Sequence, residues 1–138
     1  MKIVRAYLEI EELRLGPKLR TEVHVDDSAL HATIPLLSIQ PIVENAVKHG
    51  VASRPGTGFV RLTIKAGPAD VSIEVANTGE CDERTLTNSG GIGLANVRRR
   101  LALCYGEETR FDTQVADGVT TIGFTLPLKP TPQILASV

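Results

Sequence analysis

The chain has 138 residues, of which 42% are hydrophobic and 22% are charged, with a formal net charge of −1. This is the length of one ordinary domain, and a domain of this size buries enough surface to fold without disulfides or a metal. Aromatic residues make up 4% of the chain and there is no Trp. Together with the near-zero charge, this excludes the basic, aromatic-rich surface that nucleic-acid binding requires.

The cysteine pattern and the acidic start of the chain indicate a cytoplasmic domain. Cys81 and Cys104 form no CxxC motif, which favours a reducing compartment. No apolar run approaches the roughly 18 residues of a membrane span, and acidic residues interrupt the start of the chain, where a signal peptide would be apolar. We expect one domain over residues 1–128 and a flexible tail over residues 129–138, which contains Pro130 and Pro132.

The first third of the chain predicts two helices around a strand. From Lys2 to Leu15, apolar residues recur at steps of three and four, which predicts an amphipathic helix that ends at Gly16-Pro17. Residues 18–25 alternate as in a strand, and Asp26-Asp27-Ser28 forms a turn and a candidate helix cap. A second helix is predicted over residues 36–50.

The middle of the chain predicts a hairpin, a polar loop and a helix. Residues 59–66 and 70–77 alternate between apolar and polar, and the Gly67-Pro68 turn joins them. Residues 78–91 are polar and glycine-rich, and residues 92–104 have helical periodicity.

A second hairpin is predicted from residues 108–115 and 120–128, around Asp117-Gly118. The order of these elements predicts an α+β fold, a two-layer sandwich with one mixed, largely antiparallel sheet covered by helices on one face. Strands and helices do not alternate as a doubly wound parallel sheet requires.

The second helix carries four polar groups on one side. At about 100° per residue, Glu44, Asn45, Lys48 and His49 lie opposite an apolar arc. One interpretation is a solvated face, with a Glu44–Lys48 ion pair adding about 0.3–0.5 kcal/mol. The other is a binding site, because a carboxylate, an amide oxygen, an ammonium and an imidazole suit a divalent cation and phosphate oxygens. Asn is also a poor helix former, which favours a functional reason for Asn45.

Two further segments are candidate site elements. Gly91 and Gly93 open the third helix, where backbone N–H groups can hold a phosphate, although an ordinary turn fits the same residues. The segment contains neither a P-loop nor a dinucleotide fingerprint. Asn77 ends a strand before Thr78-Gly79 and can present its amide to the exocyclic amine of a base, or simply lie in a strand-exit turn.

Taken together, these segments resemble the catalytic ATP-binding domain of sensor histidine kinases in the GHKL (Bergerat-fold) superfamily, and the LytS-type kinases most of all. Residues 34–50 are similar to that family's N box almost residue for residue, and residues 91–101 to its second glycine box. Residues 7–14 match the segment that leads into the domain, and residues 118–127 its closing strand.

The resemblance implies ATP and Mg²⁺ as cofactors and a role for each matching residue. Asn45 would bind Mg²⁺, Glu44 would act as acid/base or orienting group, and residues 78–90 would form a lid over the nucleotide. The ATP-binding set would comprise Asn45, Lys48, His49, Asn77, Gly79, Gly91, Gly93 and Leu94.

Two positions depart from the family pattern. Asn77 stands where the family commonly has Asp, and Cys81 falls near its second glycine. An uncharged amide can also present its nitrogen instead of its oxygen, so a reduced adenine affinity is expected.

The phosphoacceptor histidine is not evident, because His24 and His31 lie in the wrong context for the family's H box. The resemblance therefore implies a catalytic module that transfers the γ-phosphoryl group of ATP to a histidine domain outside this chain, with a response regulator as indirect partner. The full-length kinase would sit at the inner membrane through other segments. Two alternatives stay open: a nucleotide-sensing interaction module without phosphotransfer, and a GHKL-type ATPase in which Glu44 activates water.

Overall fold

A computed structural model describes residues 2–26, 36–52, 54–79, 97, 99, 101–103 and 110–127. In this part of the chain, helix α1 (Lys2–Leu15) leads through a 3-10 turn at Gly16–Lys18 into the sheet, and helix α2 (Leu36–Asn45) continues as a π-helical segment over Ala46–Ala52. The strands are β1 (Leu19–Val25), β2 (Gly58–Ala66), β3 (Asp70–Thr78), β4 (Arg110–Ala116) and β5 (Val119–Pro127).

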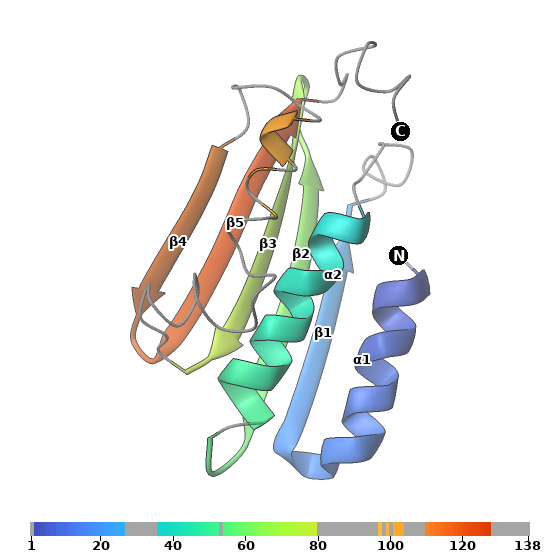
Figure 1. Ribbon diagram of the computed structural model, residues 1–138, viewed down its shortest axis with the longest axis vertical. Helices are drawn as coiled ribbons and strands as arrows, with labels where there is room; N and C mark the ends of the chain where they lie inside the picture. The colour runs from blue at the N-terminus through green and yellow to red at the C-terminus, as the bar shows by residue number, and fades with distance from the viewer. Residues whose placement is uncertain are drawn as a thin grey trace.

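These strands form one mixed sheet in the order β1-β2-β3-β5-β4. β1 and β2 are parallel, because the chain between them passes through α2, and every other neighbouring pair is antiparallel. Helices α1 and α2 lie on the same side of the sheet (Figure 1). The predicted two-layer α+β sandwich with a largely antiparallel sheet is confirmed.

The core lies between the sheet and the two helices, and it is almost entirely aliphatic. Every second side chain of the central strands points toward the helices. From Val60 to Ile64 of β2 and from Val71 to Asn77 of β3, each such residue is at most 3% exposed. Burial of one such side chain contributes about 1.5–3 kcal/mol. The largest fully buried side chains include Leu8 of α1, Ile39, Ile42 and Val43 of α2, and Leu62, Ile64 and Ile73 of the sheet.

The predicted element boundaries differ from the structure at several points. The helix predicted over residues 36–50 is α-helical only to Asn45, and its last part has the wider π-helical turn. Apolar residues at spacings of three and four suit both geometries, so the periodicity could not separate them. β1 begins at Leu19 rather than at Lys18, and Ile10 and Leu13 of α1 are exposed despite their helical spacing.

Both predicted hairpins are present. The second turns at Asp117 and Gly118, whose φ angles of 54° and 77° are those of a type I′ turn. Residues 97, 99 and 101–103 are helical within the helix predicted over residues 92–104. The predictions for residues 27–35, for most of the polar loop and for the tail lie outside the described residues.

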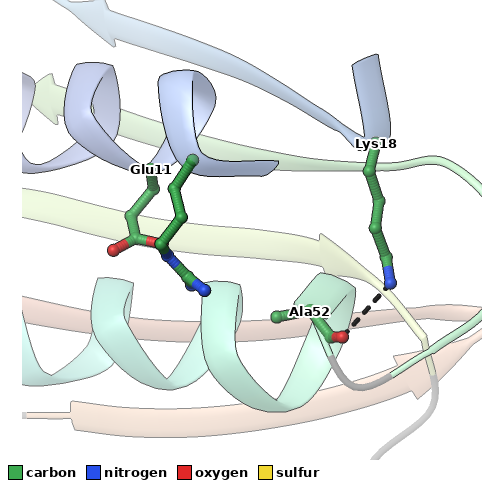
Figure 2. A network of polar contacts seen from close by, with 4 residues as sticks. Glu11, Lys18 and Ala52 are labelled. Atoms are coloured by element: carbon green, nitrogen blue, oxygen red, sulfur yellow. Dashed lines mark hydrogen bonds and ion pairs between the residues drawn. The ribbon is translucent and has the colours of Figure 1, made fainter. Parts of the chain in front are cut away.

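The end of the π-helical segment is tied to the turn that precedes β1. Lys18 Nζ donates a hydrogen bond of 3.2 Å to the carbonyl oxygen of Ala52 (Figure 2). A cation at this position satisfies an unpaired carbonyl and complements the negative end of the helix dipole. The connection between α1 and β1 thus fixes the end of the helix that carries the polar face.

No helix in the described part of the chain combines the length and the hydrophobicity that crossing a bilayer requires.

Candidate functional site

The polar face of the second helix is accessible, as its sequence predicts. Glu44 and Lys48 are exposed, Asn45 and His49 are half-buried, and the opposite side packs into the core through Ile42, Val43, Ala46 and Val47. The change to π geometry after Asn45 occurs within this face. Local π-helical turns are frequent at functional sites, which fits a binding role for these four residues.

Glu44 and Lys48 do not form the ion pair that a simple solvated face predicts. Glu44 Oε1 instead accepts a hydrogen bond of 3.1 Å from Gln40 Nε2, one helical turn earlier. Within the ranges that the structure describes, Lys48 makes no ion pair. Its ammonium group is therefore available to an anion.

Asn77, at the end of β3, lies directly beneath the end of this helix. Its side chain is 3% exposed, and it packs against Gly50 of the π-helical segment. A Cβ atom at Gly50 would lie 2.8 Å from Asn77 Cγ, closer than carbon atoms approach in folded proteins. Glycine is therefore required where the helix meets the strand, and this contact joins the two predicted site elements.

The orientation of the Asn77 amide is set by the backbone. Asn77 Nδ2 donates a hydrogen bond of 2.9 Å to the carbonyl oxygen of Thr78. The amide nitrogen is thereby engaged, and Oδ1 is the atom left to accept a hydrogen bond from a ligand. The reversed orientation that the sequence alone left open would place two N–H donors where Oδ1 now lies.

The chain that leaves β3 is held on both sides at Gly79. This buried glycine has a φ of 111°, its N–H donates to Gly118 O at 2.6 Å, and its carbonyl accepts from Thr120 Oγ1 at 2.7 Å. Arg54 packs over it, because a Cβ atom at Gly79 would lie 2.9 Å from Arg54 Cδ. The turn at the end of β3 is therefore fixed before the chain continues.

The structure thus brings Asn77 and Gly79 to the end of the helix that carries Glu44, Asn45, Lys48 and His49. Gly91, Gly93 and Leu94 lie outside the described residues. In the part of the chain that is described, no group of three or more His, Cys, Asp or Glu side chains could hold a metal ion.

Sequence reasoning missed three residues that shape this site. Gly50 lies on the apolar side of the helix and has no polar group that would indicate a role. Arg54 packs over Gly79 and Thr120 binds the carbonyl of Gly79, and neither contact has a local sequence pattern. A glycine on the buried side of a helix is a usable signal for a close approach. A side chain that hydrogen-bonds to a backbone carbonyl far away in the sequence leaves no such signal.

Tyr7 connects α1 to the polar face electrostatically. Burial of the phenol, and then the negative charges of Glu11 and Glu44, raise the pKa of Tyr7 to about 12. The proximity to Glu44 means that α1 contributes to the electrostatics of the candidate site.

Comparisons with known proteins show the family to which the chain belongs. Residues 36–130 match the family described as "Histidine kinase-, DNA gyrase B-, and HSP90-like ATPase". Sensor protein LytS of Oceanobacillus iheyensis is 31% identical over 145 residues, which cover 96% of this chain and 25% of that protein. Sensor histidine kinase YpdA of Escherichia coli is 36% identical over 137 residues, which cover 94% of this chain and 24% of that protein.

Solved structures show the same fold. The histidine kinase domain of a blue-light activated histidine kinase from Erythrobacter litoralis aligns with a TM-score of 0.70 at 17% identity, over 92% of this chain and 58% of that one. The catalytic domain of histidine kinase ThkA aligns with a TM-score of 0.67 at 17% identity, over 96% and 93% of the two chains.

The chain belongs to the family of histidine kinase-, DNA gyrase B- and HSP90-like ATPases. Within it, the chain is an ATP-binding catalytic domain of the histidine-kinase type. It spans about a quarter of the length of the curated relatives given above.

The contact between Gly50 and Asn77 predicts a strong coupling between these two positions. Gly50→Ala should destabilise the chain by about 1–3 kcal/mol, because the new methyl group overlaps the Asn77 amide. Asn77→Ala removes the overlapping atoms, so the double variant should recover at least about 1 kcal/mol relative to the sum of the single variants. Urea denaturation of the four proteins measures this coupling.

Gly123→Ala is the matched control, since its Cβ atom would lie 3.4 Å from Glu74 Cγ, an ordinary contact. Strictly additive effects at Gly50 and Asn77, or an equal loss for Gly123→Ala, would contradict the proposed close contact.

The raised pKa of Tyr7 predicts a loss of stability at alkaline pH. The unfolded chain releases the phenolic proton near pH 10, whereas the folded chain holds it to about pH 12, so the free energy of unfolding falls as the pH rises between these values. Tyr7→Phe removes this contribution. Urea denaturation of both proteins from about pH 8 upward should show the free energy of unfolding of the wild type falling relative to that of Tyr7→Phe above about pH 10. A constant difference across that range would rule out the shift.

Proposed function

We propose that this domain binds Mg·ATP and transfers its γ-phosphoryl group to a histidine on a domain outside this chain. The observation that carries the proposal is the buried Asn77 amide, whose oxygen is left as an acceptor at the end of the helix that carries four polar groups. The membership of the ATPase family and the similarity to sensor kinases support it. Residues 1–128 would form the catalytic unit and residues 129–138 a tail.

Asn77 would select the base. Its Oδ1 would accept a hydrogen bond from the exocyclic amine of adenine, because Nδ2 is already bound to the Thr78 carbonyl. Guanine presents a carbonyl oxygen at the corresponding position, which would face Oδ1 without a proton between the two atoms. The neutral amide therefore still discriminates between the bases, although it lacks the charge of the Asp that this family commonly has.

The polar face of the helix would bind the phosphates. The amide oxygen of Asn45 is a suitable ligand for Mg²⁺, which would neutralise phosphate charge when bound. Lys48 and His49 would contact phosphates or ribose, and the ammonium of Lys48 has no competing ion pair among the described residues. Gly91, Gly93 and Leu94 would receive the triphosphate at the start of the next helix, where backbone N–H groups favour an anion.

Glu44 would act on the incoming nucleophile. It is exposed, and its Oε1 atom is oriented by Gln40, so the carboxylate can position an imidazole or accept its proton. Most of the catalysis in phosphoryl transfer comes from positioning and charge stabilisation. Gln40 therefore serves as a positioning residue for Glu44.

The partners of the full-length protein would lie outside this chain. The curated relatives are about four times as long as the segment they share with it, which leaves room for a phosphoacceptor domain, dimerisation helices and a segment at the inner membrane. One structural neighbour is histidine kinase ThkA in complex with response regulator protein TrrA. A response regulator would likewise receive the phosphoryl group from the phosphohistidine of this kinase.

The alternative of a nucleotide-sensing module without phosphotransfer rests on Asn77 in place of Asp, on Cys81 and on the phosphoacceptor histidine that is not evident. The hydrogen bond from Nδ2 to the Thr78 carbonyl weakens that alternative, because it orients the amide for adenine. A GHKL-type ATPase would use the same residues, with water instead of a histidine as the nucleophile that attacks the γ-phosphate. Release of inorganic phosphate from Mg·ATP by the isolated chain would favour this second reading.

Asn45→Ala tests the proposal. Saturating Mg·ATP should raise the melting temperature of the wild type, since a ligand at 100 times its Kd stabilises by about 2.7 kcal/mol. Asn45→Ala should fold with an unchanged or slightly higher melting temperature, because Ala is the better helix former, and should lose most of the ligand-induced shift. Thermal denaturation with and without Mg·ATP measures both quantities.

Gln114→Ala removes an exposed side-chain amide from β4 and is the matched control, which should keep the full shift. An undiminished Mg·ATP shift in Asn45→Ala would refute the placement of the phosphates on this helix face.

A further inference from the structure

A pocket lies on the face of the sheet that points away from the helices. It has a volume of about 250 Å³ and is lined by Pro17, Arg20, Thr57, Gly58, Phe59 and Thr78. Leu19, Val60 and Asn77 are buried on the helix side, so their neighbours Arg20, Phe59 and Thr78 point to the other side of the pleat. The pocket is therefore separate from the proposed nucleotide site, which lies beneath the helix.

The three strands place these side chains next to one another. Arg20 of β1 is in register with Phe59 of β2, and the N–H of Phe59 donates a hydrogen bond of 3.0 Å to Thr78 Oγ1. Because the Thr78 hydroxyl oxygen accepts this bond, its proton remains available to donate to a ligand. Arg20 and Thr78 thus supply donors on either side of an aromatic ring.

Among the described residues, no acid forms an ion pair with Arg20. Arg20 is exposed and makes no ion pair or hydrogen bond in the portion of the chain that the structure describes. The next acid along the same face of β1, Glu22, is bound to Arg61 at 2.8 Å and to His24 at 3.3 Å. The hydrogen bond from Arg61 lowers the pKa of Glu22, so this carboxylate is held by its own partners and does not compete for Arg20.

The apolar part of the pocket wall is held in place. The guanidinium group of Arg61 lies over the ring of Phe59, 5.0 Å from its centroid, and Arg61 is itself fixed by Glu22. Pro17 adds a second rigid apolar surface from the turn that precedes β1. A ligand here therefore meets fixed apolar surfaces beside one cation and two hydroxyl groups.

We propose that this pocket binds a small organic anion, a carboxylate carried on a flat apolar body of about one ring. The guanidinium of Arg20 would pair with the carboxylate, the hydroxyls of Thr57 and Thr78 would donate to it, and the ring of Phe59 would pack on the apolar part. The lining combines one cation and two hydroxyl groups with an aromatic ring, and an organic anion uses this ring whereas inorganic phosphate does not.

Benzoate is the probe that tests this site. Titration of the ¹⁵N-labelled chain at constant ionic strength should give saturable amide shifts at Arg20, Phe59 and Thr78, with a Kd on the order of 1 mM for a ligand of this size. Benzamide has the same shape without the charge and should bind several-fold more weakly, the loss expected for an exposed ion pair. Inorganic phosphate should not saturate the same amides.

Variants separate the site from a general surface effect. Arg20→Gln should weaken benzoate binding several-fold and Thr57→Val by a smaller factor, each with an otherwise unchanged amide spectrum. Lys65→Gln removes an exposed cation from the far end of β2 and should bind like the wild type.

Equal binding of benzoate and benzamide, equal losses in Arg20→Gln and Lys65→Gln, or shifts that never saturate would each overturn the proposal. Saturable phosphate binding with the same dependence on Arg20 would overturn the assignment to an organic anion. None of these readouts involves a nucleotide, so they do not depend on the proposed kinase function.

Discussion

The close contact between Gly50 and Asn77 is the constraint on which the candidate site depends. A helix can carry a row of polar groups without binding anything, and a strand can end in an amide for purely local reasons. Because Gly50 has no side chain, the end of the helix packs directly against Asn77 of β3. The aliphatic core beneath them and the Lys18 hydrogen bond to Ala52 hold this approach in place.

The end of β3 presents different chemistry on its two faces. Side chains alternate along a strand, so Asn77 points under the helix and Thr78 points away from it. Thr78 contributes to both sides, because its carbonyl oxygen orients the Asn77 amide and its hydroxyl lines the pocket of Arg20 and Phe59. The same short segment therefore accounts for the base specificity proposed on one face and for the anion site proposed on the other.

Much of the fold and the polar face could be predicted from the sequence, because both depend on local patterns. The alternation in residues 59–66 and 70–77 and the Asp117-Gly118 turn specify hairpins, and both were found. The π-helical turn after Asn45 could not be predicted, since its hydrophobic spacing is also that of an α-helix. The orientation of the Asn77 amide depends on a backbone carbonyl, and the pocket at Arg20 depends on the register of three strands, which no local pattern encodes.

Nucleotide selectivity tests the proposed role of Asn77 most directly, because it depends on which atom of the Asn77 amide would face a bound base. Calorimetric titration of the wild-type chain with Mg·ATP and Mg·GTP should show ATP binding at least about tenfold more tightly, since only adenine offers an N–H to Oδ1. Equal binding of the two nucleotides, or tighter binding of GTP, would contradict the account.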